Sequence, residues 1–79
     1  MRSIIVKAEW NNEDGIWIAT SDDVPGLVTG ALTLEMLRAK IGPMIVDMIE
    51  VSELHFELAE IPVHIVAHQM ERIVNPRAA

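Results

Sequence analysis

Alternating apolar and polar residues near the start of the chain predict a β-hairpin. From residue 4 to residue 10 the two kinds of side chain alternate, which is typical of a strand with one buried face. The segment NNEDG follows at 11–15, and its Gly15 can adopt the positive φ that a tight turn needs. Residues 16–20, IWIAT, supply a second β-rich run. We therefore expect residues 4–21 to form a hairpin.

Trp10 and Trp17 flank this turn and would pair across the strands if four residues connect them. We expect the two indoles to pack in the core or in a dimer interface. The alternative is that Trp17 is exposed and docks a partner, because aromatic residues are enriched at protein interfaces.

After residue 32 the apolar spacing changes to three and four, which predicts one amphipathic helix over residues 33–50. Thr33 is placed to cap its first turn, and Glu35 lies near the positive end of the helix dipole. Pro43 has no amide hydrogen to donate and its ring crowds the preceding turn. We expect a kink there, or two short helices of which Pro43 opens the second.

The segment DDVPGLVTGALT at 22–33 connects the hairpin to the helix. We expect Pro25-Gly26 to turn a corner and residues 27–30 to form a short extended piece. Asp22 and Asp23 are turn-forming or solvated acids, and they are also candidates for contact with a basic partner or a cation. Adjacent residues of an extended chain point to opposite sides, so these two carboxylates do not form a shared site by themselves.

The last third of the sequence predicts one more strand. Residues 51–60 are ambiguous between a strand and a connection, whereas IPVHIVAH at 61–68 is a β-branched run whose Pro62 favours a sheet edge. The fold class is therefore α+β, with an antiparallel sheet of three to four strands and one kinked helix packed across it, in the order β-β-(β)-α-β. We expect a single domain over residues 1–73 and a frayed tail over 74–79.

Composition narrows the classes of function. The chain has 79 residues, 51% of them hydrophobic, and no cysteine, so its core is thin and self-association as a homodimer or tetramer is expected. A net charge of −6 repels nucleic acid and suits a basic protein partner. Because no apolar run resembles a signal peptide or a membrane span, we expect a cytoplasmic protein that does not contact membranes.

We find no residue pattern that favours catalysis, a cofactor or a metal. The three serines lie in none of the usual nucleophile motifs. His64 and His68 are about 13 Å apart along a strand, which is too far for both to ligate one ion. We expect a protein that is not an enzyme.

Residues 13–37, EDGIWIATSDDVPGLVTGALTLEML, resemble the core motif of HicB-like antitoxin domains. The residues that carry the resemblance are Asp14, Gly15, Trp17, Ala19, Asp23, Pro25, Gly26, Leu27, Thr29, Thr33, Leu34 and Glu35. The resemblance implies an α+β domain with one helix across a sheet, and a partner that is a small basic ribonuclease toxin. It also implies oligomerisation through this domain.

The chain departs from that family in two places. Met36 stands where the family has a glutamate that closes a capping box. About ten residues follow His68, where full antitoxins carry a DNA-binding segment, so the chain resembles a small stand-alone HicB-like protein and DNA binding is not expected. Two other functions remain open: a homo-oligomeric interaction module, and an RNA-binding domain, which the acidic charge disfavours.

Overall fold

The structure is a computed structural model, and it describes residues 3–52, 56 and 59–78. Its elements are the strands β1 (Ile4–Asn11), β2 (Ile16–Thr20), β3 (Val28–Ala31) and β4 (Val63–His68), and the helix α1 (Leu34–Val51). The predicted α+β class and order of elements are confirmed. Within residues 51–60, Val51 ends α1 and residues 52, 56, 59 and 60 are in no strand, while 53–55 and 57–58 lie outside the described residues.

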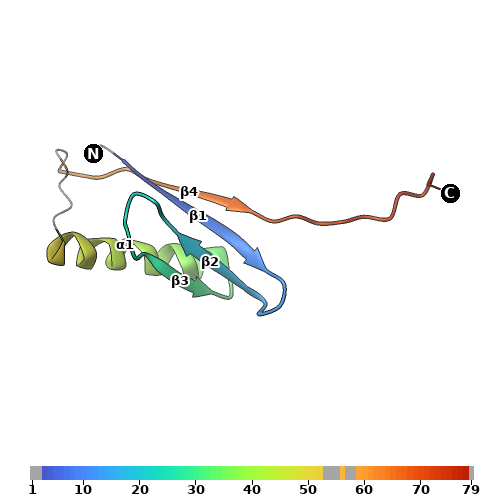
Figure 1. The fold of residues 1–79 in the computed structure, drawn as a ribbon, viewed down its shortest axis with the longest axis horizontal. Helices are drawn as coiled ribbons and strands as arrows, with labels where there is room; N and C mark the ends of the chain where they lie inside the picture. The colour runs from blue at the N-terminus through green and yellow to red at the C-terminus, as the bar shows by residue number, and fades with distance from the viewer. Residues whose placement is uncertain (1–2, 53–55, 57–58, 79) are drawn as a thin grey trace.

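The four strands form one sheet in the order β3-β2-β1-β4 (Figure 1). β1 pairs antiparallel with β2, and β2 pairs antiparallel with β3. β4 pairs parallel with β1, so the sheet is mixed and the prediction of a wholly antiparallel sheet is wrong at this strand. The reason is the helix: α1 carries the chain back past the sheet, and β4 therefore starts at the same end as β1 (Figure 1).

Alternation along β1 sets the inner face of the sheet. Ile4, Val6 and Ala8 are fully buried, while the residues between them are exposed. Ten apolar residues form the core: Ile4, Val6, Ala8, Ala19, Val24, Leu27, Ala31, Leu37, Ile41 and Ile45. The last three lie on α1 and recur at spacings of four, so the periodicity of the sequence identified the helix face correctly.

α1 begins as predicted. Thr33 is the N-cap, and its side-chain oxygen accepts a hydrogen bond from the amide of Met36 at 3.1 Å. Glu35 lies in the first turn, where its charge favours the helix dipole. The helix continues through Pro43 as one element, so the alternative of two short helices is wrong. A bend at Pro43 stays a prediction.

The corner between β2 and β3 is a β-turn. The amide of Leu27 donates to the carbonyl of Val24 at 3.1 Å, and Gly26 has φ +88°. Proline at the second position and a glycine with positive φ at the third are the requirements of a type II turn. Pro25-Gly26 therefore turns the chain, as the sequence predicted.

β4 and the residues after it differ from the rest of the fold. All six residues of β4 are exposed, and residues 69–78 continue beyond the sheet as an arm (Figure 1). The molecule is elongated as a result, with extents of 56 × 22 × 19 Å. Among the described residues, no helix combines the length and the apolar character that crossing a bilayer requires. The domain boundary at residue 73 stays a prediction.

Candidate partner-binding surface

The hairpin turn is held by the side chain of Asn11. Its Oδ1 accepts hydrogen bonds from the amides of Glu13, at 3.0 Å, and Asp14, at 3.1 Å. The amide of Gly15 donates to the Asn11 carbonyl at 2.8 Å, and Gly15 has φ +65°. The connection of four residues, 12–15, is therefore ordered by one asparagine and one glycine.

This connection brings the two tryptophans together. Trp10 lies directly opposite Trp17, with the ring centroids 5.5 Å apart and the planes at 63°, an edge-to-face arrangement. Nε1 of Trp10 donates to Oδ1 of Asn12 at 2.8 Å. Trp17 is half-buried and packs against the core, in agreement with the packing role. Contact of Trp17 with a partner stays a prediction.

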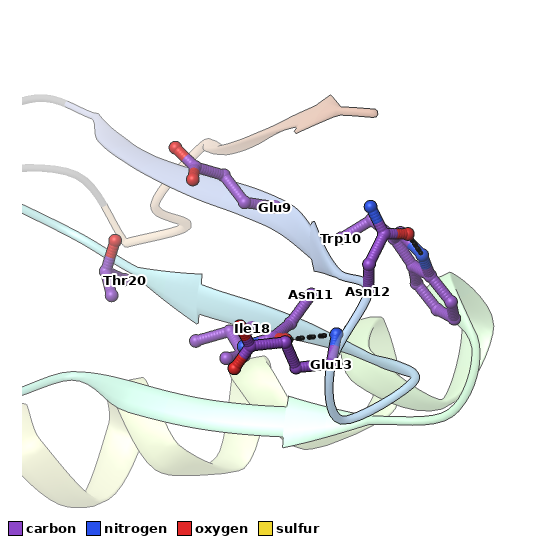
Figure 2. Close-up of a pocket in the computed structure, with 7 residues that line it drawn as sticks. All are labelled: Glu9, Trp10, Asn11, Asn12, Glu13, Ile18 and Thr20. Atoms are coloured by element: carbon purple, nitrogen blue, oxygen red, sulfur yellow. Dashed lines mark hydrogen bonds between the residues drawn. The ribbon is translucent and has the colours of Figure 1, made fainter. Parts of the chain in front are cut away.

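A hollow of about 560 Å³ lies beside the turn, and we call it the hairpin hollow (Figure 2). Its lining residues are Glu9, Trp10, Asn11, Asn12, Glu13, Ile18 and Thr20. Glu9 and Ile18 face each other across β1 and β2, on the side of the sheet opposite the core. No described helix or strand covers that side.

The lining of the hairpin hollow suits a basic side chain. It offers two carboxylates, Glu9 and Glu13, together with amide oxygens, and it includes no lysine or arginine. Ile18 adds apolar surface on which the methylene groups of a lysine or arginine can pack. Sequence reasoning did not single out Glu9 or Glu13; the signal was the acid-rich run EWNNED around a turn.

The two adjacent aspartates lie outside the hollow and have different environments. Oδ2 of Asp23 accepts a hydrogen bond from the amide of Ile5 at 2.8 Å, and the hydroxyl of Ser21 donates to the Ile5 carbonyl at 2.7 Å. These side chains bind the backbone of β1 at a position to which the pairing with β2 does not extend. Asp23 is thus engaged within the fold.

Asp22 points to solvent. Its side chain is 98% exposed, and its Oδ2 lies 3.8 Å from Nζ of Lys7. The carboxylates of Asp22 and Asp23 therefore point in different directions, as the sequence predicted. Asp22 is accessible to a partner at the surface, and for both aspartates a partner contact stays a prediction.

The other residues singled out by the sequence build the fold. Gly15, Pro25, Gly26, Thr33, Glu35 and Pro43 occupy turns and the helix, and none of them lines the hairpin hollow. His64 and His68 lie on β4, in register with Ile5 and Glu9. Within residues 3–52, 56 and 59–78, no three side chains of the metal-binding types come together.

The chain matches a protein-family domain whose function is not known. Residues 3–75 match the domain of unknown function DUF1902, and the chain belongs to that family. The crystal structure of the hypothetical protein TTHA1013 from the extremely thermophilic bacterium Thermus thermophilus is similar, with a TM-score of 0.72 and 40% sequence identity. The similarity covers 94% of this chain and 100% of that one. No curated protein matches the chain.

Proposed function

We propose that this member of DUF1902 is a non-enzymatic, antitoxin-type protein of the cytoplasm that binds a small basic ribonuclease toxin and holds it inactive. Two features of the sequence support the proposal: the resemblance of residues 13–37 to HicB-like antitoxins and the net charge of −6. The observation that carries it is the hairpin hollow, which Glu9 and Glu13 line together and which no lysine or arginine lines.

The chemistry of neutralisation follows from what a ribonuclease must bind. RNA is a polyanion, so the surface that receives it is basic. An acidic protein that covers this surface competes with RNA for the same cations. In this proposal Glu9 and Glu13 accept hydrogen bonds from arginine or lysine of the toxin, and Asp22 extends the acidic surface beyond the hollow.

In this proposal the charges raise the association rate and the selectivity of binding more than they raise the affinity. An exposed ion pair contributes only ~0–1 kcal/mol, so two carboxylates do not hold a toxin by themselves. The acidic field raises the rate of encounter and rejects acidic partners. Apolar contact with Ile18 supplies the rest in this proposal.

The test is co-expression with any small basic protein that a neighbouring gene encodes, followed by affinity capture and an assay of growth inhibition. The test variant is Glu9→Lys with Glu13→Lys. The matched control, Asp47→Lys with Glu50→Lys, makes the same charge change on exposed positions of α1. Each pair adds four units to a net charge of −6 and leaves −2.

The hollow variant is expected to bind the toxin at least about tenfold more weakly and to fail in neutralisation, a loss of about 1.4 kcal/mol in binding free energy. The control is expected to change binding by less than about threefold. Equal losses in both variants would show that only total charge matters, and the hollow would not be the site. Absence of any basic partner that co-purifies would end the antitoxin proposal.

A further inference from the structure

β4 and the arm that follows it carry apolar side chains with nothing packed on them. Within residues 63–74, Val66, Met70, Ile73 and Val74 are 55%, 60%, 88% and 91% exposed. Even Ile65, which lies beside the buried Val6 of β1, stays 36% exposed. α1 packs mainly on β2 and β3. The described part of the chain therefore leaves most of the apolar surface of these twelve residues without a second layer.

The whole molecule exposes more surface than a compact protein of its mass. A monomer of 8.8 kDa is expected to expose about 4,800 Å², and this chain exposes 6242 Å². Its radius of gyration is 15.9 Å, against about 12 Å for a compact chain of this length. A stable interface hides about 800 Å² on each partner, so the excess surface is large enough to supply one.

The charges favour a second copy of this chain as the occupant. Residues 1–60 contain four basic and eleven acidic residues and carry −7, whereas residues 61–79 contain two basic and one acidic residue and carry +1, in agreement with the overall −6. A basic protein is attracted to the body and gains nothing from residues 63–74, whose one acid, Glu71, and one base, Arg72, cancel. Two copies of this segment meet without net repulsion, whereas two acidic bodies repel each other.

We propose that residues 63–74 form the interface of a twofold homodimer. The outer edge of β4 in one copy pairs with the same segment of the other, and residues 69–74 of each copy lie along the partner's β4. Identical strands related by a twofold axis perpendicular to them run antiparallel, and the axis passes between one residue and its own copy. Near the centre of the segment this residue is Gln69, which lies opposite the Gln69 of the other copy. The two sheets become one, and the exposed strand edges are paired.

The first experiment measures mass by analytical ultracentrifugation of the full chain between 1 and 100 µM, a concentration range chosen around about micromolar affinity. The expected result is a rise from 8.8 kDa to twice that mass. Ile73→Asp with Val74→Asp is expected to raise the dissociation constant at least about 30-fold, and both positions are exposed in the monomer, so folding is not disturbed. The control, Leu32→Asp with Val51→Asp, makes the same change at two other exposed apolar residues and is expected to leave the dimer intact.

The second experiment locates the axis. The chain has no cysteine, so a single cysteine reports without background. Gln69→Cys is expected to form a disulfide between copies on mild oxidation, because the two Cα atoms near the axis fall within the ~7 Å that a disulfide allows. Arg38→Cys, on the exposed surface of α1, is expected to remain a thiol.

A monomer at 100 µM would overturn the proposal, as would a dimer whose mass the arm variant leaves unchanged. A dimer in which Gln69→Cys fails to cross-link would overturn the twofold arrangement. An arm that binds only a different acidic protein, while the chain alone stays monomeric, would overturn the choice of occupant. None of these results depends on a basic toxin, so the dimer and the antitoxin proposal fail separately.

Discussion

β3 and β4 are the two edge strands of the same sheet, and they differ in length, in exposure and in the packing of α1. β3 has four residues, α1 packs against it, and Nζ of Lys40 on α1 donates to the carbonyl of its Gly30 at 2.7 Å. β4 has six residues, all exposed, and the main packing of α1 is on β3 and β2. Short length and a lysine are devices by which proteins close an edge against other strands. Their presence at β3 and absence along β4 indicate which edge is available for pairing.

The largest expected difference in stability is between a residue of the core beneath α1 and a residue of β4. Leu37 is fully buried between α1 and the sheet, and Leu37→Ala is expected to lower the free energy of unfolding by about 2–5 kcal/mol. Ile65 of β4 is 36% exposed, and Ile65→Ala is expected to cost the monomer only about 1–1.5 kcal/mol. Urea denaturation at low protein concentration measures both. Equal losses would mean that β4 belongs to the same packed core as α1.

The next prediction concerns the corner that leads into β3. Gly26 has φ +88°, and an L-residue there costs about 1–2 kcal/mol. Gly26→Ala is expected to lower stability by that amount, with the space around the new Cβ playing little part, since the nearest atom is the flexible end of Met48 at 3.4 Å. Gly26→Asn should cost less, because asparagine tolerates positive φ better. Thermal unfolding of the two variants measures both effects. If Gly26→Ala were as stable as the native chain, the assignment of the type II turn would be refuted.

A smaller effect is expected at the two aspartates. Asp23→Ala removes the acceptor of the Ile5 amide, and a hydrogen bond of this kind contributes about 1 kcal/mol. Asp22→Ala removes an exposed carboxylate and should leave stability unchanged. Chemical denaturation of the two variants side by side is the measurement. The reverse order of effects would contradict the structural role given to Asp23.

The smallest change in stability is expected at the lysine that closes β3. Lys40→Ala removes an exposed hydrogen bond and should cost at most about 0.5 kcal/mol. It also frees the Gly30 carbonyl, so species larger than a dimer should appear in ultracentrifugation at high concentration. Lys40→Arg keeps a donor and serves as the control. If both variants have the mass distribution of the native chain, Lys40 does not guard this edge.

Local patterns predicted most of the elements. The alternation from Ile4 to Ala8 identified the inner face of β1, and Thr33 identified the start of α1, because both depend on contacts within a few residues. The direction of β4 was predicted wrongly, since it depends on where the helix returns the chain. Continuity of α1 through Pro43 was left undecided, because tertiary packing can hold a helix together around a missing hydrogen bond.

The surface was harder to predict than the fold. The hairpin hollow depends on how Asn11 folds the turn and on which strand residues lie opposite Glu9, and neither is visible in residue types alone. The β-branched residues of β4 predicted a strand at an edge correctly. They did not reveal that both faces of the strand are open, because burial depends on which element packs over it.

The difference between the two edges can be measured directly by amide hydrogen exchange on the full chain at two concentrations, one on each side of the rise in mass. We expect exchange in residues 63–74 to slow at the higher concentration, because pairing with a second copy protects their amides, while exchange in β3, Val28–Ala31, stays the same. Unchanged exchange in 63–74 while the mass doubles would show that the dimer forms elsewhere, and would contradict the account.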